Sequence, residues 1–154
     1  MHSIRMNVMI NARPEDVYSV ARDCQRWGQW YANLSEPKSV KGNCGVGTIV
    51  ECQYTIMGVH VPMTIEVTED FKGENECRWS GNIKGPITGR QHCTYMAKDN
   101  GTEAVFEIEY DLPEGIIGKL ADKLLIEKLQ QNALVQTLDN LKVVSEHKVP
   151  VETR

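Results

Sequence analysis

One stretch near the C-terminus constrains the fold more than any other. Residues 119–146 contain no proline and no glycine, and they follow a break at Leu112-Pro113-Glu114-Gly115. The stretch is rich in leucine, lysine, glutamate and glutamine, which are strong helix formers. It predicts a helix of about thirty residues, about 45 Å long. Because that is longer than a small domain is wide, its apolar side needs a large partner surface.

The predicted helix has one broad apolar stripe at about 100° per residue. Its members are Ile117, Leu120, Leu124, Gln131, Leu134, Val135 and Leu138, with Leu141 at the edge. Gln131 is the polar residue within this stripe, and Glu127 lies at its margin one turn earlier. Lysines at the margins can keep their charged ends in water.

The partner surface is predicted to be a sheet. From Pro37 to Leu112 apolar residues recur at every second position, as in strands with one buried face. Turn signals separate the segments, among them Met57-Gly58 and Asp99-Asn100-Gly101. With a first strand over Ile4–Ile10 this makes about seven strands, and their short links predict an antiparallel sheet with one wet face.

Two short helices are predicted between the first strand and the others. Pro14 suits the first turn of one helix, and Asp23 can cap the next. The second contains Trp27, Trp30 and Tyr31 within five residues. These aromatic side chains either plug one end of the core or border the mouth of a ligand cavity.

Length and charge exclude several classes of protein. The 154 residues, 41% hydrophobic and 25% charged, suit one core. We expect one domain over residues 1–146 and a loose tail over residues 147–154. The net charge of −4 gives no support to nucleic-acid binding. No apolar run reaches about eighteen residues and no signal peptide is apparent, so we expect no integral membrane segment.

The cysteines and histidines favour neither a disulfide framework nor a metal site. The five cysteines are odd in number and scattered, so we interpret them as reduced thiols in a cytoplasmic protein. Cys52, Cys77 and Cys93 suit small core positions. The four histidines are far apart, and glycine-rich phosphate loops and serine nucleophile motifs are absent. We expect no metal and no cofactor.

Several segments, in the right order, resemble one superfamily. They are residues 10–18, Trp27 with Trp30, Val46-Gly47-Thr48, Gly101-Thr102, residues 112–120, and residues 137–142 with Glu146. Together they resemble the START/Bet v 1-like (SRPBCC) helix-grip superfamily, which includes polyketide cyclase/dehydrase and lipid-transport proteins. The resemblance implies an α+β fold of β-α-α-β6-α order, a curved antiparallel sheet wrapped around the C-terminal helix. It implies less about function, because members bind lipids, hormones or polyketides, act on chaperones, or catalyse cyclisation.

Sheet and helix cannot fit flush along their whole length, so we expect an apolar cavity between them. The candidate ligand-binding residues are Trp27, Trp30, Tyr54, Met63, Trp79, Arg90, His92, Phe106, Tyr110, Leu124, Glu127 and Gln131. Arg90 and His92 face the cavity if Met96 pairs with Ala104 and both point inward; otherwise they lie on a solvated face.

The chemistry of these candidates leaves catalysis open. A desolvated Glu127 has a raised pKa and can act as an acid or base, but it can also pair with a lysine at the sheet edge. His92 can act as a base, and Arg90 can hold an anion. Gln131 can hydrogen-bond a ligand oxygen, whereas Tyr110 can do so or simply belong to the core.

Three functions are compatible with this pattern. The first is binding or carrying a small hydrophobic molecule, such as a lipid, an isoprenoid or an aromatic polyketide. The second is a polyketide cyclase- or dehydratase-type enzyme that uses Arg90, His92, Glu127 and Gln131. The third is a module that binds a protein partner through an exposed apolar patch. The sequence leaves homodimer formation open.

Overall fold

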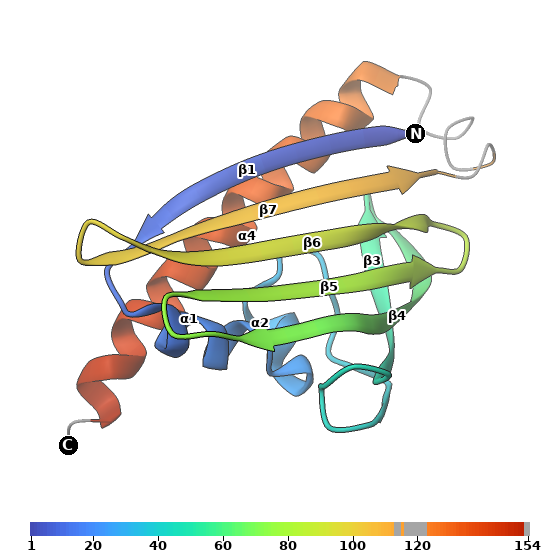
Figure 1. The fold of residues 1–154 in the computed structure, drawn as a ribbon. Coiled ribbons are helices and arrows are strands. Elements are labelled where there is room, and N and C mark those ends of the chain that lie inside the picture. The colour runs from blue at the N-terminus through green and yellow to red at the C-terminus, as the bar shows by residue number, and fades with distance from the viewer. Residues whose placement is uncertain (113–114, 116–122, 153–154) are drawn as a thin grey trace.

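The computed structural model describes residues 1–112, 115 and 123–152 (Figure 1). Along the chain the elements are β1 (His2–Ile10), α1 (Pro14–Ala21), the 3₁₀ helix η1 (Cys24–Arg26), α2 (Trp27–Trp30), β2 (Ser39–Lys41), β3 (Ile49–Ile56), β4 (Val59–Lys72), β5 (Glu76–Lys84), β6 (Thr88–Lys98), β7 (Gly101–Asp111) and α4 (Lys123–Glu152). No helix among these residues is both long enough and apolar enough to cross a membrane.

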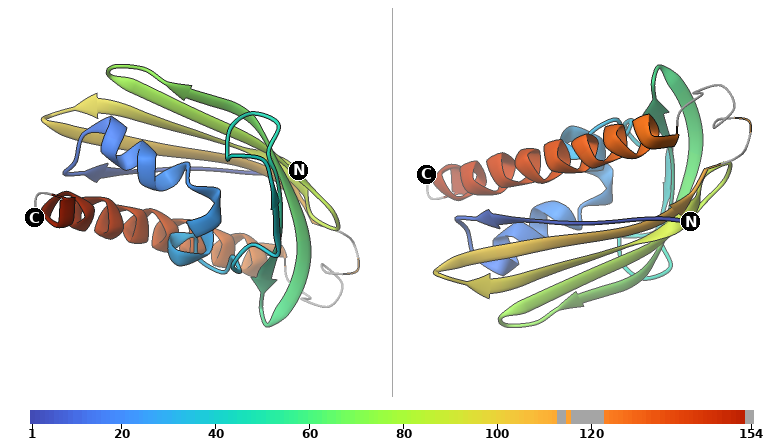
Figure 2. Two further views of the ribbon diagram at one scale, coloured as in Figure 1. Left: turned by 90° about the horizontal axis from the view of Figure 1, so that it is seen from below. Right: turned by 90° about the horizontal axis from the view of Figure 1, so that it is seen from above.

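The strands form one antiparallel sheet in the order β1-β7-β6-β5-β4-β3-β2. Figure 2 shows that the sheet is strongly curved, with α4 and the short helices on its concave side. The strands β3 and β4 curl toward the first turns of α4, so that the sheet surrounds this part of the helix. This is the helix-grip arrangement, and the predicted α+β class and strand order are confirmed.

The local signals at the helix starts are also confirmed. Pro14 occupies the first turn of α1, where a missing N–H costs nothing. The carboxylate of Asp23 accepts a hydrogen bond of 3.2 Å from the backbone N–H of Gln25 and caps η1. These two signals place α2, which carries Trp27 and Trp30, over the concave face of the sheet.

The β6–β7 turn corrects the predicted register. Asp99 and Asn100 both have positive φ, 50° and 63°, as a two-residue type I′ hairpin requires. Tyr95 therefore pairs with Ala104, and the pairing of Met96 with Ala104, the condition for Arg90 and His92 to face inward, is not met. Gly101 pairs with Lys98 and begins β7. The close approach of Ile10 requires glycine there, because a Cβ would lie 2.5 Å from the carbonyl oxygen of Ile10.

The buried side of α4 is rotated relative to the predicted stripe. Leu124 and Val135 are 74% and 48% exposed, and Gln131 is exposed as well. The positions Ile117 and Leu120 lie outside the described residues. The buried residues are Ile126, Leu134, Thr137, Leu138, Leu141 and Ser145. The interpretation followed the apolar residues alone, but two small polar residues belong to the buried side.

Side chains near the end of α4 fix the helix to the rest of the molecule. The hydroxyl of Thr137 accepts a hydrogen bond of 3.0 Å from the N–H of Ala32. The amide of Asn140 donates one of 3.0 Å to the carbonyl of Trp30. Glu146 accepts one of 2.8 Å from the N–H of Asn11. The helix then continues to Glu152, so part of the segment predicted as a loose tail has helical backbone.

A disulfide between Cys24 and Cys44 overturns the expectation that all five cysteines are reduced. It joins η1 to the loop between β2 and β3, two segments that are 20 residues apart in sequence. Their spacing gives no local signal, so only the folded chain brings them together. Cys52, Cys77 and Cys93 are free and buried, as predicted for core positions.

Candidate ligand cavity

A hollow lies between the concave face of the sheet, α2 and the middle of α4. The space open to the centres of water molecules inside it is about 90 Å³, and the whole hollow, with the part open to solvent, measures about 970 Å³. None of its described lining residues is Asp, Glu, His, Lys or Arg. The described lining is therefore mostly apolar, and its polar side chains are uncharged.

Three tryptophans build one side of the cavity. Trp27 packs edge-on against Trp79, with ring centroids 5.3 Å apart, and its indole N–H donates to the carbonyl of Ala21 at 2.8 Å. Trp30 meets Phe106 at 6.3 Å in a similar edge-on arrangement. All three tryptophans are buried and line the hollow. Trp27 and Trp30 thus belong to the core and border the cavity at the same time.

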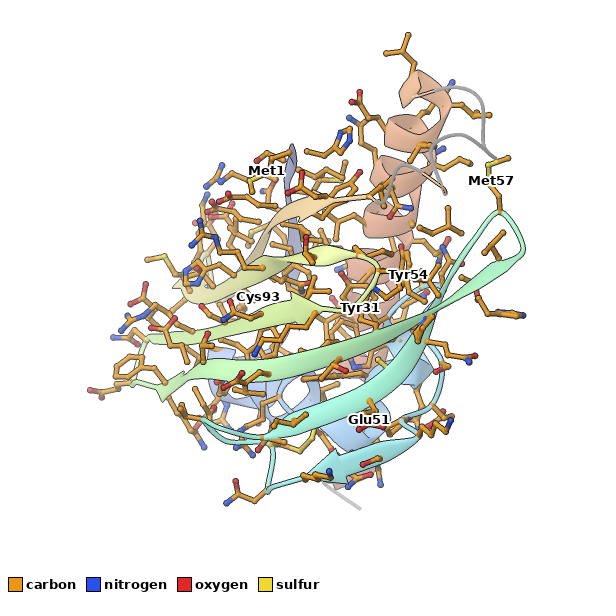
Figure 3. The ribbon with its side chains drawn as sticks, turned by 90° about the vertical axis from the view of Figure 1, so that its right-hand side faces the viewer. Met1, Tyr31, Glu51, Tyr54, Met57 and Cys93 are labelled. Atoms are coloured by element: carbon orange, nitrogen blue, oxygen red, sulfur yellow. A yellow bond between two sulfur atoms is a disulfide. The ribbon has the colours of Figure 1, made fainter. Side chains whose placement is uncertain are left out.

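Two tyrosine–glutamine pairs supply hydrogen-bonding groups. The hydroxyl of Tyr31 donates to Oε1 of Gln91 at 2.7 Å, and that of Tyr54 donates to Oε1 of Gln130 at 2.9 Å. Figure 3 shows Tyr31 and Tyr54 close together in the interior, with Cys93 nearby on the sheet. Each glutamine accepts at its carbonyl oxygen. The amide of Gln91 also donates to Sγ of Cys93 at 3.2 Å, and an amide group has two N–H donors, so each glutamine remains suited to a further acceptor.

Three further donors have no hydrogen-bond partner among the described residues. They are the indole N–H groups of Trp30 and Trp79 and the hydroxyl of Tyr110. All three residues line the cavity. Buried polar groups in folded proteins nearly always have a partner, so each such group calls for a water or a ligand atom.

Burial keeps the titratable side chains of the cavity uncharged at neutral pH. It raises the pKa of Tyr110 to about 12, and that of the Cys93 thiol to about 12. Burial also raises the pKa of Tyr31 and of Tyr54, although hydrogen bonds with Asn33 and Gln130 lower the latter in part. The tyrosines are thus hydrogen-bond donors, and the thiol is a poor nucleophile.

Half of the residues selected from the sequence line this hollow. They are Trp27, Trp30, Tyr54, Met63, Trp79 and Tyr110. Phe106 is fully buried and packs against Trp30, but it does not reach the cavity.

Arg90 and His92 lie on the opposite face of the sheet. Their side chains are 68% and 42% exposed. Arg90 lies 3.7 Å from a carboxylate oxygen of Glu109, and the ring of His92 lies 2.6 Å from the hydroxyl of Ser80. The inward orientation predicted for both residues is wrong, because it depended on the incorrect register of the β6–β7 hairpin.

The candidates on α4 are likewise displaced. Leu124 and Gln131 point to solvent, so their predicted inward positions are wrong. Glu127 is 38% exposed, and its Oε1 lies 3.0 Å from Nδ1 of His2. His2 is thus its partner in place of the lysine considered from the sequence. The ring of His2 stacks on Tyr110, with centroids 5.1 Å apart.

Sequence reasoning missed Tyr31, Gln91 and Gln130 as polar groups of the cavity. Tyr31 had been noted only as part of an aromatic cluster. Gln91 lies on the strand whose inner face was assigned incorrectly, and Gln130 precedes the residue that was chosen in its place. The signal that could have found Gln130 is its spacing of four and seven residues from the buried Leu134 and Thr137.

The family follows from the sequence as a whole. A family model described as polyketide cyclase / dehydrase and lipid transport matches residues 1–146. The chain belongs to this family, and the predicted resemblance is confirmed. No curated protein matches the chain.

Solved structures share the fold at low sequence identity. TTHA0849 from Thermus thermophilus superposes with a TM-score of 0.73 at 23% identity, covering 94% of this chain and 97% of that one. The Zhui aromatase/cyclase from Streptomyces sp. R1128 gives 0.69 at 12% identity, with 96% and 95% covered. A norcoclaurine synthase mutant from Thalictrum flavum, in complex with a transition-state analogue, gives 0.64 at 15%, with 96% of both chains covered. At these identities the matches establish the fold alone.

Proposed function

We propose that the chain, as one domain over residues 1–146, binds or carries a small hydrophobic molecule in the cavity between sheet and α4. The observation that carries this proposal is the lining: aromatic and aliphatic side chains with a few hydrogen-bonding groups and no charge among the described residues. Concave apolar spaces with a small number of convergent polar groups are typical ligand sites. Lipids, isoprenoids and aromatic polyketides all have the required apolar surface.

A binding role fits the placement of the ionisable side chains better than catalysis does. Arg90 and His92, which motivated the enzyme hypothesis, face solvent on the far side of the sheet. Glu127 is paired with His2 outside the described lining. The titratable groups among the described lining residues are tyrosines and a cysteine, whose pKa values burial raises. At neutral pH these groups are protonated and cannot act as bases.

A cyclase- or dehydratase-type function is the second candidate. It is favoured by the family description and by the hydroxyls of Tyr31, Tyr54 and Tyr110, which can polarise a bound carbonyl. Such an enzyme would act by folding a reactive substrate against these donors. Conversion of a poly-β-ketone to a ring product by the wild-type protein, and its loss in Tyr54→Phe, is the result expected of it.

The predicted cytoplasmic location loses one of its premises. It depended on five reduced cysteines, whereas Cys24 and Cys44 are joined. Disulfides persist mainly in oxidising compartments. For the membrane, the finding is limited to the helices of the described residues, none of which is long and apolar enough to cross one.

The binding proposal is tested by asking what the protein retains and what it takes up. Native mass spectrometry of gently extracted protein should reveal a bound apolar molecule. Because the chain has three tryptophans and all of them line the cavity, uptake of an apolar compound should change the intrinsic fluorescence.

A matched pair of variants links uptake to the cavity. Ala133 lines the hollow, so Ala133→Phe should fill it and weaken binding at least tenfold. The neighbouring Asn132 is exposed, and Asn132→Phe adds the same ring outside. Equal binding by the two variants, or a wild-type protein that takes up no apolar compound, contradicts the proposal.

A further inference from the structure

The hydrogen-bonding groups of the cavity form one cluster. Tyr31 donates to Gln91 and Tyr54 donates to Gln130. Tyr54 is close enough to both Tyr31 and Tyr110 for its charge to raise the pKa of each. The cluster of these five residues, which we call the tyrosine–glutamine cluster, combines groups from β3, β6, β7, α4 and the segment after α2. The rest of the lining is almost entirely apolar.

In and around this cluster there are hydrogen-bond donors that have no acceptor among the described residues. The hydroxyl of Tyr110 and the indole N–H groups of Trp30 and Trp79 have no partner among the described residues. Gln91 and Gln130 each receive a hydrogen bond at their carbonyl oxygen, which orients their N–H groups as donors. One N–H of Gln91 donates to Sγ of Cys93, so Gln130 is the glutamine better placed to serve a ligand. A ligand that satisfies such a site brings oxygen atoms that accept hydrogen bonds.

The electrostatics of the cavity select against a charged ligand. No described lining residue is a cation, and an anion moved out of water needs a charged partner to offset its desolvation. Burial holds the tyrosine hydroxyls protonated far above neutral pH, so their dipoles suit a carbonyl or phenol oxygen. A fatty-acid carboxylate would find no counter-ion among the described lining residues.

The size of the hollow is compatible with a small ring system. About 90 Å³ is open to the centres of water molecules, so the space around those centres is larger and exceeds the volume of a single water. A ligand of one or two rings is the smallest aromatic guest that this space suits. Trp27, Trp30 and Trp79 line the hollow and provide aromatic surfaces against which such rings can pack.

We infer that the cavity is selective for a neutral aromatic molecule of one or two rings that carries a phenol or carbonyl oxygen, and that the tyrosine–glutamine cluster recognises this oxygen. The inference rests on the proposed binding function. It adds the polarity of the ligand and names the residues that form hydrogen bonds with the ligand oxygen. Gln130 and Tyr54 contribute the hydrogen bonds that determine specificity, and the tryptophans contribute apolar contact.

Three probes with the same ring system separate these contributions. Binding of 2-naphthol, naphthalene and 2-naphthoate to the full chain is measured by equilibrium dialysis at pH 7. One net hydrogen bond predicts that 2-naphthol binds about threefold to tenfold more tightly than naphthalene. 2-Naphthoate should bind more weakly than either. Equal affinity for 2-naphthol and naphthalene, or a preference for 2-naphthoate, overturns the inference while leaving the binding function intact. No binding of any probe overturns both.

Two variants and a control test the assigned residues. Tyr54→Phe and Gln130→Leu should each lower the affinity for 2-naphthol by about threefold to tenfold and leave that for naphthalene within twofold. Gln131→Leu makes the same change one residue further, where the side chain is exposed, and should change neither. If Gln130→Leu fails to fold, Tyr54→Phe alone decides, since it removes one oxygen and keeps the ring. Unchanged selectivity in Tyr54→Phe overturns the role of the cluster.

Discussion

Removal of the Cys24–Cys44 disulfide should lower the stability of the protein by about 3 kcal/mol. The two cysteines are 20 residues apart, and closing a loop of about this length reduces the entropy of the unfolded chain by an amount worth about 3 kcal/mol at 25 °C. For a domain of this size, that change corresponds to a decrease in Tm of about 6–12 °C.

The assay compares oxidised and reduced protein under otherwise identical conditions. Protein equilibrated with oxidised glutathione is unfolded in urea with and without dithiothreitol, and the double variant Cys24→Ala/Cys44→Ala is treated in the same way. We expect dithiothreitol to lower the free energy of unfolding of the wild type but not that of the double variant. Cys52→Ala is the matched control, because Cys52 is buried but free, and it should keep the full response to dithiothreitol.

Thiol counting gives an independent and decisive check. The chain contains five cysteines, of which Cys52, Cys77 and Cys93 are free. Denatured protein that has not been reduced should therefore show three reactive thiols, and reduction should raise the number to five. Five thiols before reduction, or a stability that does not respond to dithiothreitol, would refute the reasoning.

Two further predictions concern single polar groups. Thr137→Val keeps the shape of the side chain but removes the acceptor of the Ala32 N–H. Ala32 is half-buried, so leaving its N–H unpaired should cost about 1 kcal/mol in urea unfolding, the lower end of the range for a buried group. A loss below about 0.5 kcal/mol would count against the contact. Burial alone would raise the pKa of Asp70, but hydrogen bonds from Arg22 and Tyr18 outweigh it and hold the pKa below its ordinary value. The stabilisation by Asp70 is therefore complete above its unfolded pKa of about 4 and is lost as the pH falls further. The difference in Tm between the wild type and Asp70→Asn should be largest at neutral pH and shrink below about pH 4, and a difference independent of pH would contradict this account.

The sequence predicted the architecture because its signals are local and repeated. Alternation along β3 and β4, the proline at the start of α1 and the glycine-free stretch of α4 each depend on short-range patterns. A whole strand or helix tolerates an error of one residue, so the element order survives such errors.

The site was predicted less well because it depends on the phase of those patterns. The pairing considered from the sequence required a three-residue turn at Asp99-Asn100-Gly101, whereas the observed turn has two residues. This difference of one residue exchanges the two faces of β6. Arg90 and His92 were therefore selected as cavity residues in place of Gln91. A similar shift on α4 substituted Gln131 for Gln130. The disulfide was missed for a different reason, since contacts between η1 and the β2–β3 loop exist only in the folded chain.

The fastening of α4 has a mechanical consequence. Thr137, Asn140 and Glu146 bind the backbone of the α2 region and of the β1–α1 connection. The earlier turns are held instead by side-chain pairs, Gln130 with Tyr54 and Glu127 with His2. Side chains can change rotamer more readily than a backbone segment can move, so we expect adjustment to guests of slightly different shape at Gln130 and Tyr54, with the backbone contacts of the later turns unchanged.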